Sequence, residues 1–364
     1  MKIIAVESIV ADIPFRTPFV VWRGEVPAKR HVFVRIATHA GITGWGEAAP
    51  FLFYAPETAE GIHAMLETVV AGELLGRDPR DVRRLMGDLG MIDGHLMTKA
   101  AVETALWDIL ARAAGLPLYR LLGGAVREAV PLTAIVGHAA PAEMAAEARA
   151  WVERGFRSLK IKIGYGIDAD VAMVAAVREA VGPEPRIRVD AEEFYATKAA
   201  LAVGRGLEPF GIELVSQPVP RTDWAGMAFL RQRLPMPLLA DEGIHSPADV
   251  ATCVATGAAD MVNIKVLKSG GLLSSLEMAA ICRAHHLPVL VGSMIESGIG
   301  SLVAAHFALA EPAVFSTELC GPLLFADDLL DRPLAIRDGA IRLDESPGLG
   351  RAPDPAKLAR YRVA

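Results

Sequence analysis

Cysteine and positive charge are both scarce in this chain. Three of its 364 residues are cysteines, and the spacing of Cys253, Cys282 and Cys320 matches neither a metal-binding motif nor an even-numbered disulfide framework. We therefore expect small buried thiols in a cytoplasmic protein. Lysine and arginine number 37 against 43 aspartates and glutamates, which gives a net charge of −6. This balance provides no basic surface for nucleic acid or an anionic membrane, so we expect neither partner.

Long apolar runs are also missing. No stretch approaches the roughly 20 apolar residues that span a bilayer. The alternating start of the chain is interrupted by Glu7, so we expect no secretory signal. The Gly-Tyr-Gly of residues 164–166 lacks the spacing of a dinucleotide-binding fingerprint and is most simply a turn.

The composition favours a soluble protein with a large core. Hydrophobic residues make up 52% of the chain and charged residues 22%. A chain of this length exceeds one ordinary domain, so we expect one large and one smaller domain.

Residues 1–125 are expected to form an α+β domain. Alternating patterns predict antiparallel strands at the start, at 31–38 and at 43–47, with residues 14–29 as a loop. From residue 57 to 123 the pattern becomes helical. The predicted loop carries large side chains that pack or cover a ligand: Phe15, Phe19, Trp22 and Arg23.

Residues 126–330 alternate short β-rich runs with alanine-rich helices. Eight strands with intervening helices over about 200 residues predict a parallel (β/α) barrel. Residues 331–364 are expected to return to the first domain. The predicted strands are 132–136, 158–163, 187–191, 212–216, 238–242, 261–266, 289–293 and 314–319.

The second predicted strand carries two lysines, Lys160 and Lys162, on alternate positions. Side chains two residues apart on a strand share a face, so both ammonium groups are expected inside the barrel. Like charge and partial burial should lower each pKa towards a value at which a lysine acts as a base. Two solvated lysines on an edge strand are the alternative.

Acidic side chains follow at the ends of the next strands. Four polar residues at expected strand ends follow one another at intervals of 26, 25 and 24 residues: Asp190, Ser216, Asp241 and Lys265. Such even spacing is typical of successive βα units. Strand ends of such a barrel form the catalytic rim. Gathered carboxylates suit magnesium or manganese, and a lysine beside the metal suits proton transfer at the carbon next to a carboxylate. An ion-paired interior without catalysis is the alternative.

As a set, these motifs resemble the enolase superfamily in its muconate lactonizing enzyme subgroup. The matching motifs are Lys160-x-Lys162, Val189-Asp190, Gln217-Pro218, Ala240-Asp241-Glu242 and Lys265-x-x-Lys268-x-Gly270-Gly271, together with Trp45-Gly46-Glu47 and residues 121–124, 317–324 and 347–350. The resemblance implies an α+β capping domain over a (β/α)7β barrel and a symmetric homo-oligomer. It also implies that Lys162 acts on the α-carbon, Lys160 tunes it and Lys265 stands on the opposite face.

Two positions depart from the family pattern. Where the family has a glutamate ligand immediately before Gln-Pro, this chain has Ser216. Where the family usually has Asn two residues after the third-strand Asp, this chain has Glu192. Losing one carboxylate should weaken divalent binding. One hypothesis is that Glu192 joins Asp190 and Asp241 in a displaced metal site. The competing hypothesis is a weak or lost metal site.

Other rim residues point to the substrate. Residues 317–324 resemble muconate and chloromuconate cycloisomerases more than dipeptide epimerases, and residues 292–296 lack the histidine of the mandelate racemase subgroup. Glu318 is expected to pair with Lys265 across the barrel. Candidate substrate-binding residues are Glu318, Met294, Glu296 and Arg23, the last of which is alternatively a solvated surface arginine.

The sequence therefore predicts a cycloisomerase-type isomerase that acts on a small carboxylate through a metal-stabilised enolate. Two alternatives remain. The first is another activity of the subgroup, namely N-succinyl amino acid racemisation, o-succinylbenzoate synthesis or dipeptide epimerisation. The second is a metal-poor carboxylate-binding protein, because Ser216 replaces a ligand.

Overall fold

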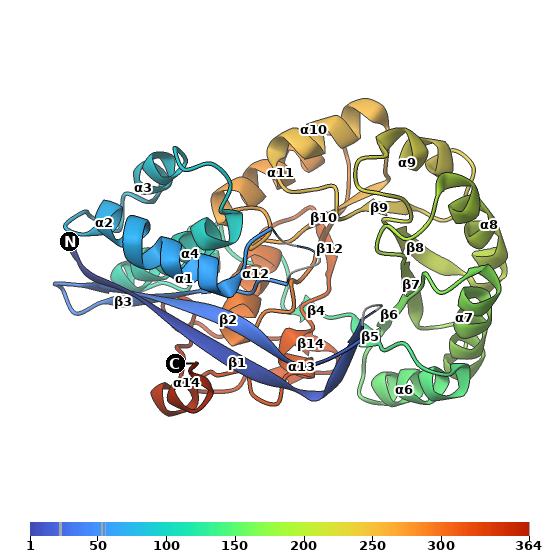
Figure 1. The fold of residues 1–364 in the computed structure, drawn as a ribbon, viewed down its shortest axis with the longest axis horizontal. Coiled ribbons are helices and arrows are strands. Elements are labelled where there is room, and N and C mark those ends of the chain that lie inside the picture. Colours follow the sequence, from blue (N-terminus) through green and yellow to red (C-terminus); the bar gives the residue numbers. More distant parts are fainter. Residues whose placement is uncertain (22–23, 52–53, 55, 364) are drawn as a thin grey trace.

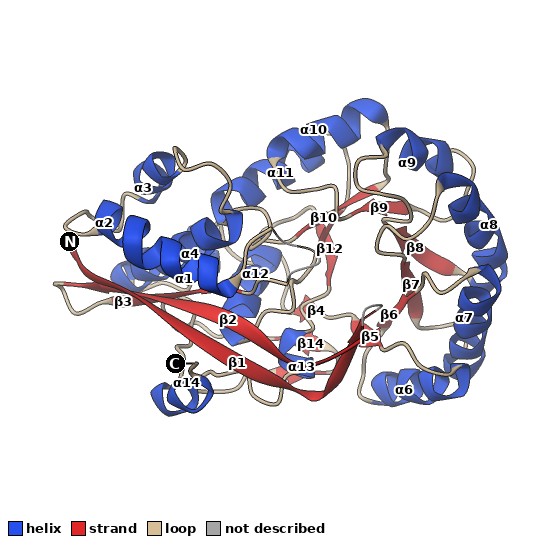
Figure 2. Ribbon diagram, in the orientation of Figure 1, coloured by secondary structure: helices blue, strands red, loops and turns tan. Residues whose placement is uncertain are grey.

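The structure is a computed structural model that describes residues 1–21, 24–51, 54 and 56–363. Figure 1 shows an N-terminal domain, drawn in blue and cyan, beside a barrel drawn in green to orange. Figure 2 shows the barrel strands inside an arc of helices. Trp22 and Arg23 of the predicted loop lie outside the described residues.

The capping domain begins with an antiparallel sheet of order β1-β2-β3. Its strands are β1 (Ile3–Val21), β2 (Gly24–Thr38) and β3 (Thr43–Ala48). The prediction of a loop over residues 14–29 was wrong, because β1 and β2 pair almost to the hairpin tip, with Phe19 opposite Val26. A register shift between Pro14 and Phe19 accommodates the proline, which cannot donate to the ladder. The Phe15 ring stacks on the Phe325 ring with 4.6 Å between the ring centroids, so the hairpin arm packs on the barrel.

One long helix, α4 (Leu96–Ala114), packs across this sheet. It ends at Gly115, whose φ of 69° is the left-handed conformation that closes many helices. The other helical elements are short: α1 (Ala59–Met65), the π-helical η1 (Leu66–Val70), α2 (Ala71–Leu74), α3 (Val82–Leu89) and α5 (Leu118–Leu121).

The eight predicted barrel strands are present and all pair in parallel, in sequence order. A parallel bridge between Leu132 and Thr317, with the Thr133 amide donating to the Thr317 carbonyl at 3.0 Å, joins the last strand to the first. The strands are β5 (Ala134–Val136), β6 (Ser158–Lys162), β7 (Arg186–Asp190), β8 (Ile212–Ser216), β9 (Leu238–Ala240), β10 (Met261–Ile264), β11 (Val289–Val291) and β12 (Val314–Thr317).

Seven helices connect these strands, which confirms the (β/α)7β barrel. In α10 the Ser246 hydroxyl accepts a hydrogen bond from the Asp249 amide, Pro247 is the first helical residue and Gly257 ends the helix. The helices are α6 (Pro141–Glu153), α7 (Ile167–Val181), α8 (Thr197–Leu207) with the 3-10 turn η2 (Glu208–Phe210), α9 (Trp224–Arg231), α10 (Pro247–Thr256), α11 (Leu272–Ala284) and α12 (Gly298–Ala310).

The C-terminal segment contacts both domains. It contains β13 (Ile336–Arg337), β14 (Ala340–Ile341) and α14 (Pro355–Tyr361), and the short helix α13 (Gly321–Leu324) precedes it after the last barrel strand. β14 pairs with β4 (Val130–Pro131) beside the barrel. The end of the chain then reaches the capping sheet, where Val363 donates to the Val10 carbonyl at 2.9 Å, and Figure 1 shows α14 beside β1.

None of the described helices is long and apolar enough to cross a bilayer.

Strand β3 and helix α4 pack closely through two glycines. A Cβ added at Gly46 would lie 1.8 Å from the Ala101 carbonyl oxygen, and one at Gly44 would lie 2.1 Å from that of Ala105. Both contacts involve helix backbone, which cannot rotate away. Glycine at these positions therefore sets the distance between sheet and helix.

We predict that Gly46→Ala destabilises the protein by about 1–3 kcal/mol or more, because the sheet must move away from α4. Urea denaturation followed by circular dichroism measures the free energy of unfolding. The matched control is Gly87→Ala in α3, where an added Cβ meets no atom within 4 Å. Gly87→Ala should leave the free energy of unfolding unchanged or raise it by up to about 1 kcal/mol. Equal stability of the two variants would contradict the prediction.

Candidate active site

The barrel strands end in a pocket beneath the capping hairpin. Its cavity has a volume of about 60 Å³. The pocket is lined by Phe19, Phe51, Tyr54, Ile135, Lys160, Lys162, Asp190, Glu192, Glu242, Lys265, Ser293, Met294, Ile295, Glu318 and Cys320.

On one side of the pocket, β6 and β7 bring two lysines to one carboxylate. Asp190 Oδ2 lies 2.8 Å from both Lys160 Nζ and Lys162 Nζ. The register explains this geometry, because Lys162 and Asp190 are direct partners across the two strands. Lys160 also donates to Glu318 at 2.6 Å, and Lys162 also contacts Glu192. The structure thus brings five of the predicted site residues together.

These ion pairs change the expected protonation state. Burial lowers the pKa of Lys160 and of Lys162, but the carboxylates of Asp190 with Glu318 and Glu192 outweigh it, so both pKa values are raised. The prediction of lowered lysine pKa values was therefore wrong. It considered the two lysines alone, whereas each ammonium faces two carboxylates. In this state both lysines carry a proton at neutral pH.

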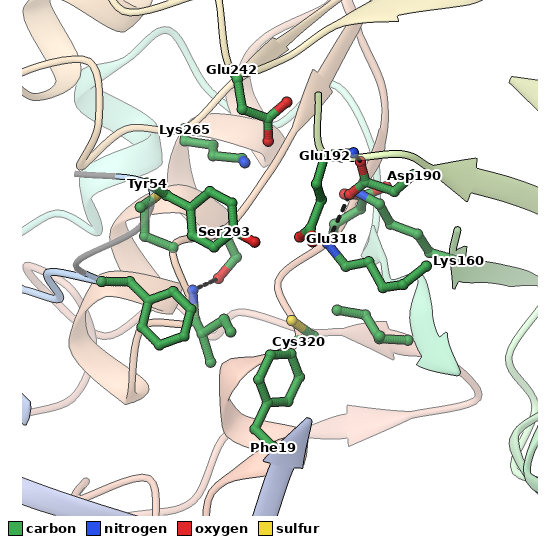
Figure 3. A pocket seen from close by; sticks show the side chains of 15 residues that line it. Phe19, Tyr54, Lys160, Asp190, Glu192, Glu242, Lys265, Ser293, Glu318 and Cys320 are labelled. Atoms are coloured by element: carbon green, nitrogen blue, oxygen red, sulfur yellow. Dashed lines mark hydrogen bonds and ion pairs between the residues drawn. The ribbon is translucent and has the colours of Figure 1, made fainter. Parts of the chain in front are cut away.

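On the opposite side, Asp241 binds a second pair of lysines. Its Oδ1 lies 2.8 Å from Lys265 Nζ and 3.3 Å from Lys268 Nζ, and Asn263 donates to its Oδ2 at 2.8 Å. Figure 3 shows Lys265 and Glu242 facing Lys160 and Asp190 across the pocket. The expected pair of Glu318 with Lys265 was wrong, because Glu318 pairs with Lys160 on the neighbouring side of the barrel.

Ser216 and Glu242 carry buried oxygens that need a partner. Within the described residues, Ser216 Oγ and Glu242 Oε2 have no hydrogen-bond partner. Burial and the nearby negative charge of Asp241 raise the pKa of Glu242 to about 8. The sequence analysis missed Glu242, because strand alternation would point it away from Asp241. β9 ends at Ala240, so alternation does not apply there.

The donor set fits a hard divalent cation in its chemistry. Asp190, Ser216 and Asp241 follow one another on β7, β8 and the end of β9, and all offer oxygen. Among the described residues, no three acidic, histidine or cysteine side chains converge on one point. An ion here would therefore be held by two carboxylates and the orphaned Ser216 hydroxyl. Glu192, which reaches the site from a turn with φ of 45°, contacts Lys162 instead.

The loop after β11 places its predicted residues differently. Met294 lines the pocket, whereas Glu296 is absent from the pocket lining formed by the described residues. The buried Glu296 carboxylate accepts the Met294 amide at 2.8 Å and the Ser293 hydroxyl. Glu296 therefore shapes the loop from behind. Arg23 lies outside the described residues.

The sequence analysis also missed Tyr54 and Cys320 as pocket residues. Cys320 follows the end of β12 at Thr317, so strand alternation gives no direction for its side chain. Tyr54 comes from a loop between β3 and α1, where no periodic pattern reveals direction. Burial raises the pKa of the Cys320 thiol to about 12, so the thiol is a neutral part of the wall.

Comparison with known proteins gives the family. A profile of the mandelate racemase / muconate lactonizing enzyme N-terminal domain matches residues 4–123, and an enolase C-terminal domain-like profile matches residues 143–357. Muconate cycloisomerase 1 of Rhodococcus opacus is 35% identical over 96% of this chain and 95% of its own length. N-succinyl-L-Arg/Lys racemase of Bacillus cereus is 33% identical over 96% and 95%.

A solved structure gives the same result. The dipeptide epimerase of Cytophaga hutchinsonii, in complex with Mg and the dipeptide D-Ala-L-Val, superposes with a TM-score of 0.95 at 30% identity, over 99% of this chain and 98% of that one. Relatives of three different activities thus share nearly the whole length of the chain at similar identity.

All three cysteines are predicted to resist alkylation in the folded protein. Burial raises the pKa to about 11 for Cys253 and about 12 for Cys282 and Cys320. Because the reactive thiolate exists only above these pKa values, its fraction at pH 8 is on the order of 10⁻³ or less. Iodoacetamide at pH 8 should leave the native protein unlabelled by mass spectrometry and add three groups in urea. Rapid native labelling of Cys320 would show an ionised or exposed thiol.

Proposed function

Because this chain belongs to the mandelate racemase / muconate lactonizing enzyme family of the enolase superfamily and is an isomerase, we propose that it transfers a proton at the carbon next to a carboxylate of a small substrate. The first candidate reaction is the cycloisomerisation of a muconate-type dicarboxylate. Like the substrate, the symmetric homo-oligomer that the resemblance implies is a proposal.

The observation that carries the cycloisomerase proposal is the place of Lys162, which lines the pocket at the end of β6. Its ammonium is bound by Asp190 and Glu192 at the pocket surface, and these carboxylates raise its pKa. A lysine that rests in its charged form is prepared to donate a proton. Cycloisomerisation needs such a donor, because ring closure leaves negative charge on the substrate that ends when its α-carbon is protonated.

The proposed sequence conserves atoms and charge. One carboxylate oxygen of the substrate bonds to the carbon that is β to the second carboxylate. The π bond between this carbon and the α-carbon beside the second carboxylate breaks, and its electron pair moves to the α-carbon as an enolate. Lys162 gives its proton to that carbon, which forms a C–H bond and leaves a neutral amine. Lys160, held by Asp190 and Glu318, keeps a positive charge beside the developing enolate. Solvent then reprotonates Lys162.

A magnesium or manganese ion is proposed as the cofactor. Asp190, Asp241 and Ser216 would hold it, with Glu192 as the candidate additional ligand. When bound, such an ion stabilises the negative charge of an enolate. The Mg in the related dipeptide epimerase supports this assignment.

Racemisation or epimerisation is the second candidate. Lys265, which follows β10, lines the same pocket as Lys162 at the end of β6, and Figure 3 shows Lys265 across the pocket from Lys160. Two lysines on opposite faces of a substrate can remove and return one proton. Dipeptide epimerisation is supported less well than N-succinyl amino acid racemisation. The Glu318 carboxylate is committed to Lys160, and the next pocket residue on that strand end, Cys320, is a neutral thiol, so neither readily binds a free ammonium of a dipeptide. o-Succinylbenzoate synthesis remains a further possibility of the subgroup.

The two lysines separate these reactions. We predict that Lys162→Ala lowers kcat for cis,cis-muconate by roughly 10²–10⁴-fold, the usual contribution of a positioned acid or base. Lys265→Ala should retain most of this activity if cycloisomerisation is the reaction, since one proton donor suffices. The loss of muconate absorbance measures the rate. The exposed Lys198→Ala is the matched control and should behave as wild type.

Racemisation predicts a different result for Lys265→Ala. If N-succinyl amino acids are the substrates, exchange of the α-proton with deuterium, followed by NMR, should stop in both Lys162→Ala and Lys265→Ala. Turnover of neither substrate class, together with measurable carboxylate binding, would favour a noncatalytic carboxylate-binding protein.

Metal binding tests the ligand set directly. We predict that Ser216→Glu binds Mn²⁺ about tenfold or more tightly than wild type, because it restores a carboxylate ligand. Calorimetry on metal-stripped protein and the electron paramagnetic resonance of Mn²⁺ measure this without any substrate. Glu192→Gln should weaken binding if Glu192 is a ligand and leave it unchanged if Glu192 serves Lys162. Identical Mn²⁺ affinity of wild type and Ser216→Glu would place the ion elsewhere.

A further inference from the structure

One wall of the pocket is strained. Ser293, Met294 and Ile295, in the loop after β11, all line the pocket. Ile295 has φ of 58°, in the left-handed region that a β-branched side chain strongly disfavours. Such a conformation persists only where its surroundings hold it, and it is common at functional sites. A specific partner must therefore fix this loop.

Lys29, from β2 of the capping domain, provides that partner. Its Nζ donates to the Ile295 carbonyl at 3.0 Å, to the Ala49 carbonyl at 3.0 Å and to the Met294 carbonyl. A lysine ammonium has three N–H donors, and all three are used here. The Lys29 residue is 3% exposed. The ammonium thus binds converging carbonyl oxygens as a fixed cation would.

A second group of the capping domain holds the other half of the loop. Glu47, on β3, accepts the Ser297 amide at 2.7 Å and the Gly300 amide at 2.8 Å. Burial lowers the pKa of Lys29 to about 8, and the negative charges of Glu296 and Glu47 partly offset this effect. Two neighbouring strands of the capping sheet therefore bind opposite ends of one loop.

We propose that Lys29 is a positioning residue that sets the shape of this pocket wall and thereby helps to determine which substrates bind. It also connects the wall to the capping hairpin. Phe19, at the pocket end of the hairpin, pairs with Val26, three residues before Lys29 on the same strand. Movement of the hairpin and movement of the wall are therefore coupled through β2. The part of this proposal that concerns substrate selection rests on the proposed function.

The first test needs no substrate. Lys29→Met keeps the length of the side chain and removes its three donors. Hydrogen–deuterium exchange, read by mass spectrometry on peptides that cover residues 293–300, should become about tenfold or more faster than in wild type. The control is Lys198→Met, which replaces an exposed lysine of α8. That control should leave exchange of residues 293–300 unchanged.

The second test uses cis,cis-muconate as the probe. For Lys29→Met we expect KM to rise about tenfold while kcat stays within about threefold, since the wall contacts bound substrate without taking part in proton transfer. Lys29→Gln retains two N–H donors and should fall between wild type and Lys29→Met in both measurements. It also serves as the test if Lys29→Met does not fold.

The outcomes separate the two proposals. Unchanged exchange of residues 293–300 in a folded Lys29 variant would overturn the role of Lys29, whatever the activity. A fall in kcat with KM unchanged would also overturn it, because it would indicate a role in the chemical step. Faster exchange in a protein whose wild type does not turn over muconate would support the positioning role and reject only the cycloisomerase assignment.

Discussion

The carboxylate of Asp190, shared between Lys160 and Lys162, is the interaction on which the rest of the site depends. Two ammonium groups on alternate positions of one buried strand repel each other and have lost their water. One carboxylate oxygen of Asp190, on β7, pairs with both ammonium groups, because the strand register places Asp190 directly beside Lys162. Removing one partner of a buried ion pair costs several kcal/mol, since the other charge remains buried. The protonation state of the pocket is thus a consequence of strand register.

The two domains divide the work of the pocket. The barrel supplies the charged groups, because parallel strands place all their ends on one rim. The capping domain supplies the enclosure. Phe19 covers the pocket, Phe15 stacks on Phe325, and Lys29 fixes the backbone of Met294 and Ile295. The chemistry can therefore remain constant while the wall changes, which agrees with relatives of three activities at about one-third identity.

Periodic features were the predictable part of this protein. All eight barrel strands and the position of Asp190, Asp241, Lys162 and Lys265 at their ends follow from alternation and even spacing. The errors arose where a structure depends on contacts between segments that are distant in the sequence. The segment 14–29 was expected to be a loop but is a hairpin, because each arm completes the hydrogen-bond ladder of the other. Glu318 binds Lys160 rather than Lys265 because sequence gives a side chain's face but not its nearest neighbour across the barrel.

The lysine pKa values were also difficult to predict from the sequence, because a pKa depends on the charges of all neighbouring groups. Considered as a pair, Lys160 and Lys162 should have lowered pKa values, and the carboxylates from three other segments reverse that direction. Glu242 was missed for a related reason. It follows the last residue of β9, so the turn, which alternation does not describe, decides where it points.

Ser216 alters the competition for the acidic groups. Around the described pocket, four ammonium groups face five carboxyl groups: Lys160, Lys162, Lys265 and Lys268 against Asp190, Glu192, Asp241, Glu242 and Glu318. A glutamate at position 216 would add a sixth carboxyl group and leave more negative charge for a cation. If the site binds the cation that we propose, the cation would take Asp190 and Asp241 from lysines that already neutralise them. Lys162 would then lose one of the two charges that raise its pKa, so its proton would become easier to transfer. Binding of the proposed cation would therefore make the proposed proton donor more acidic.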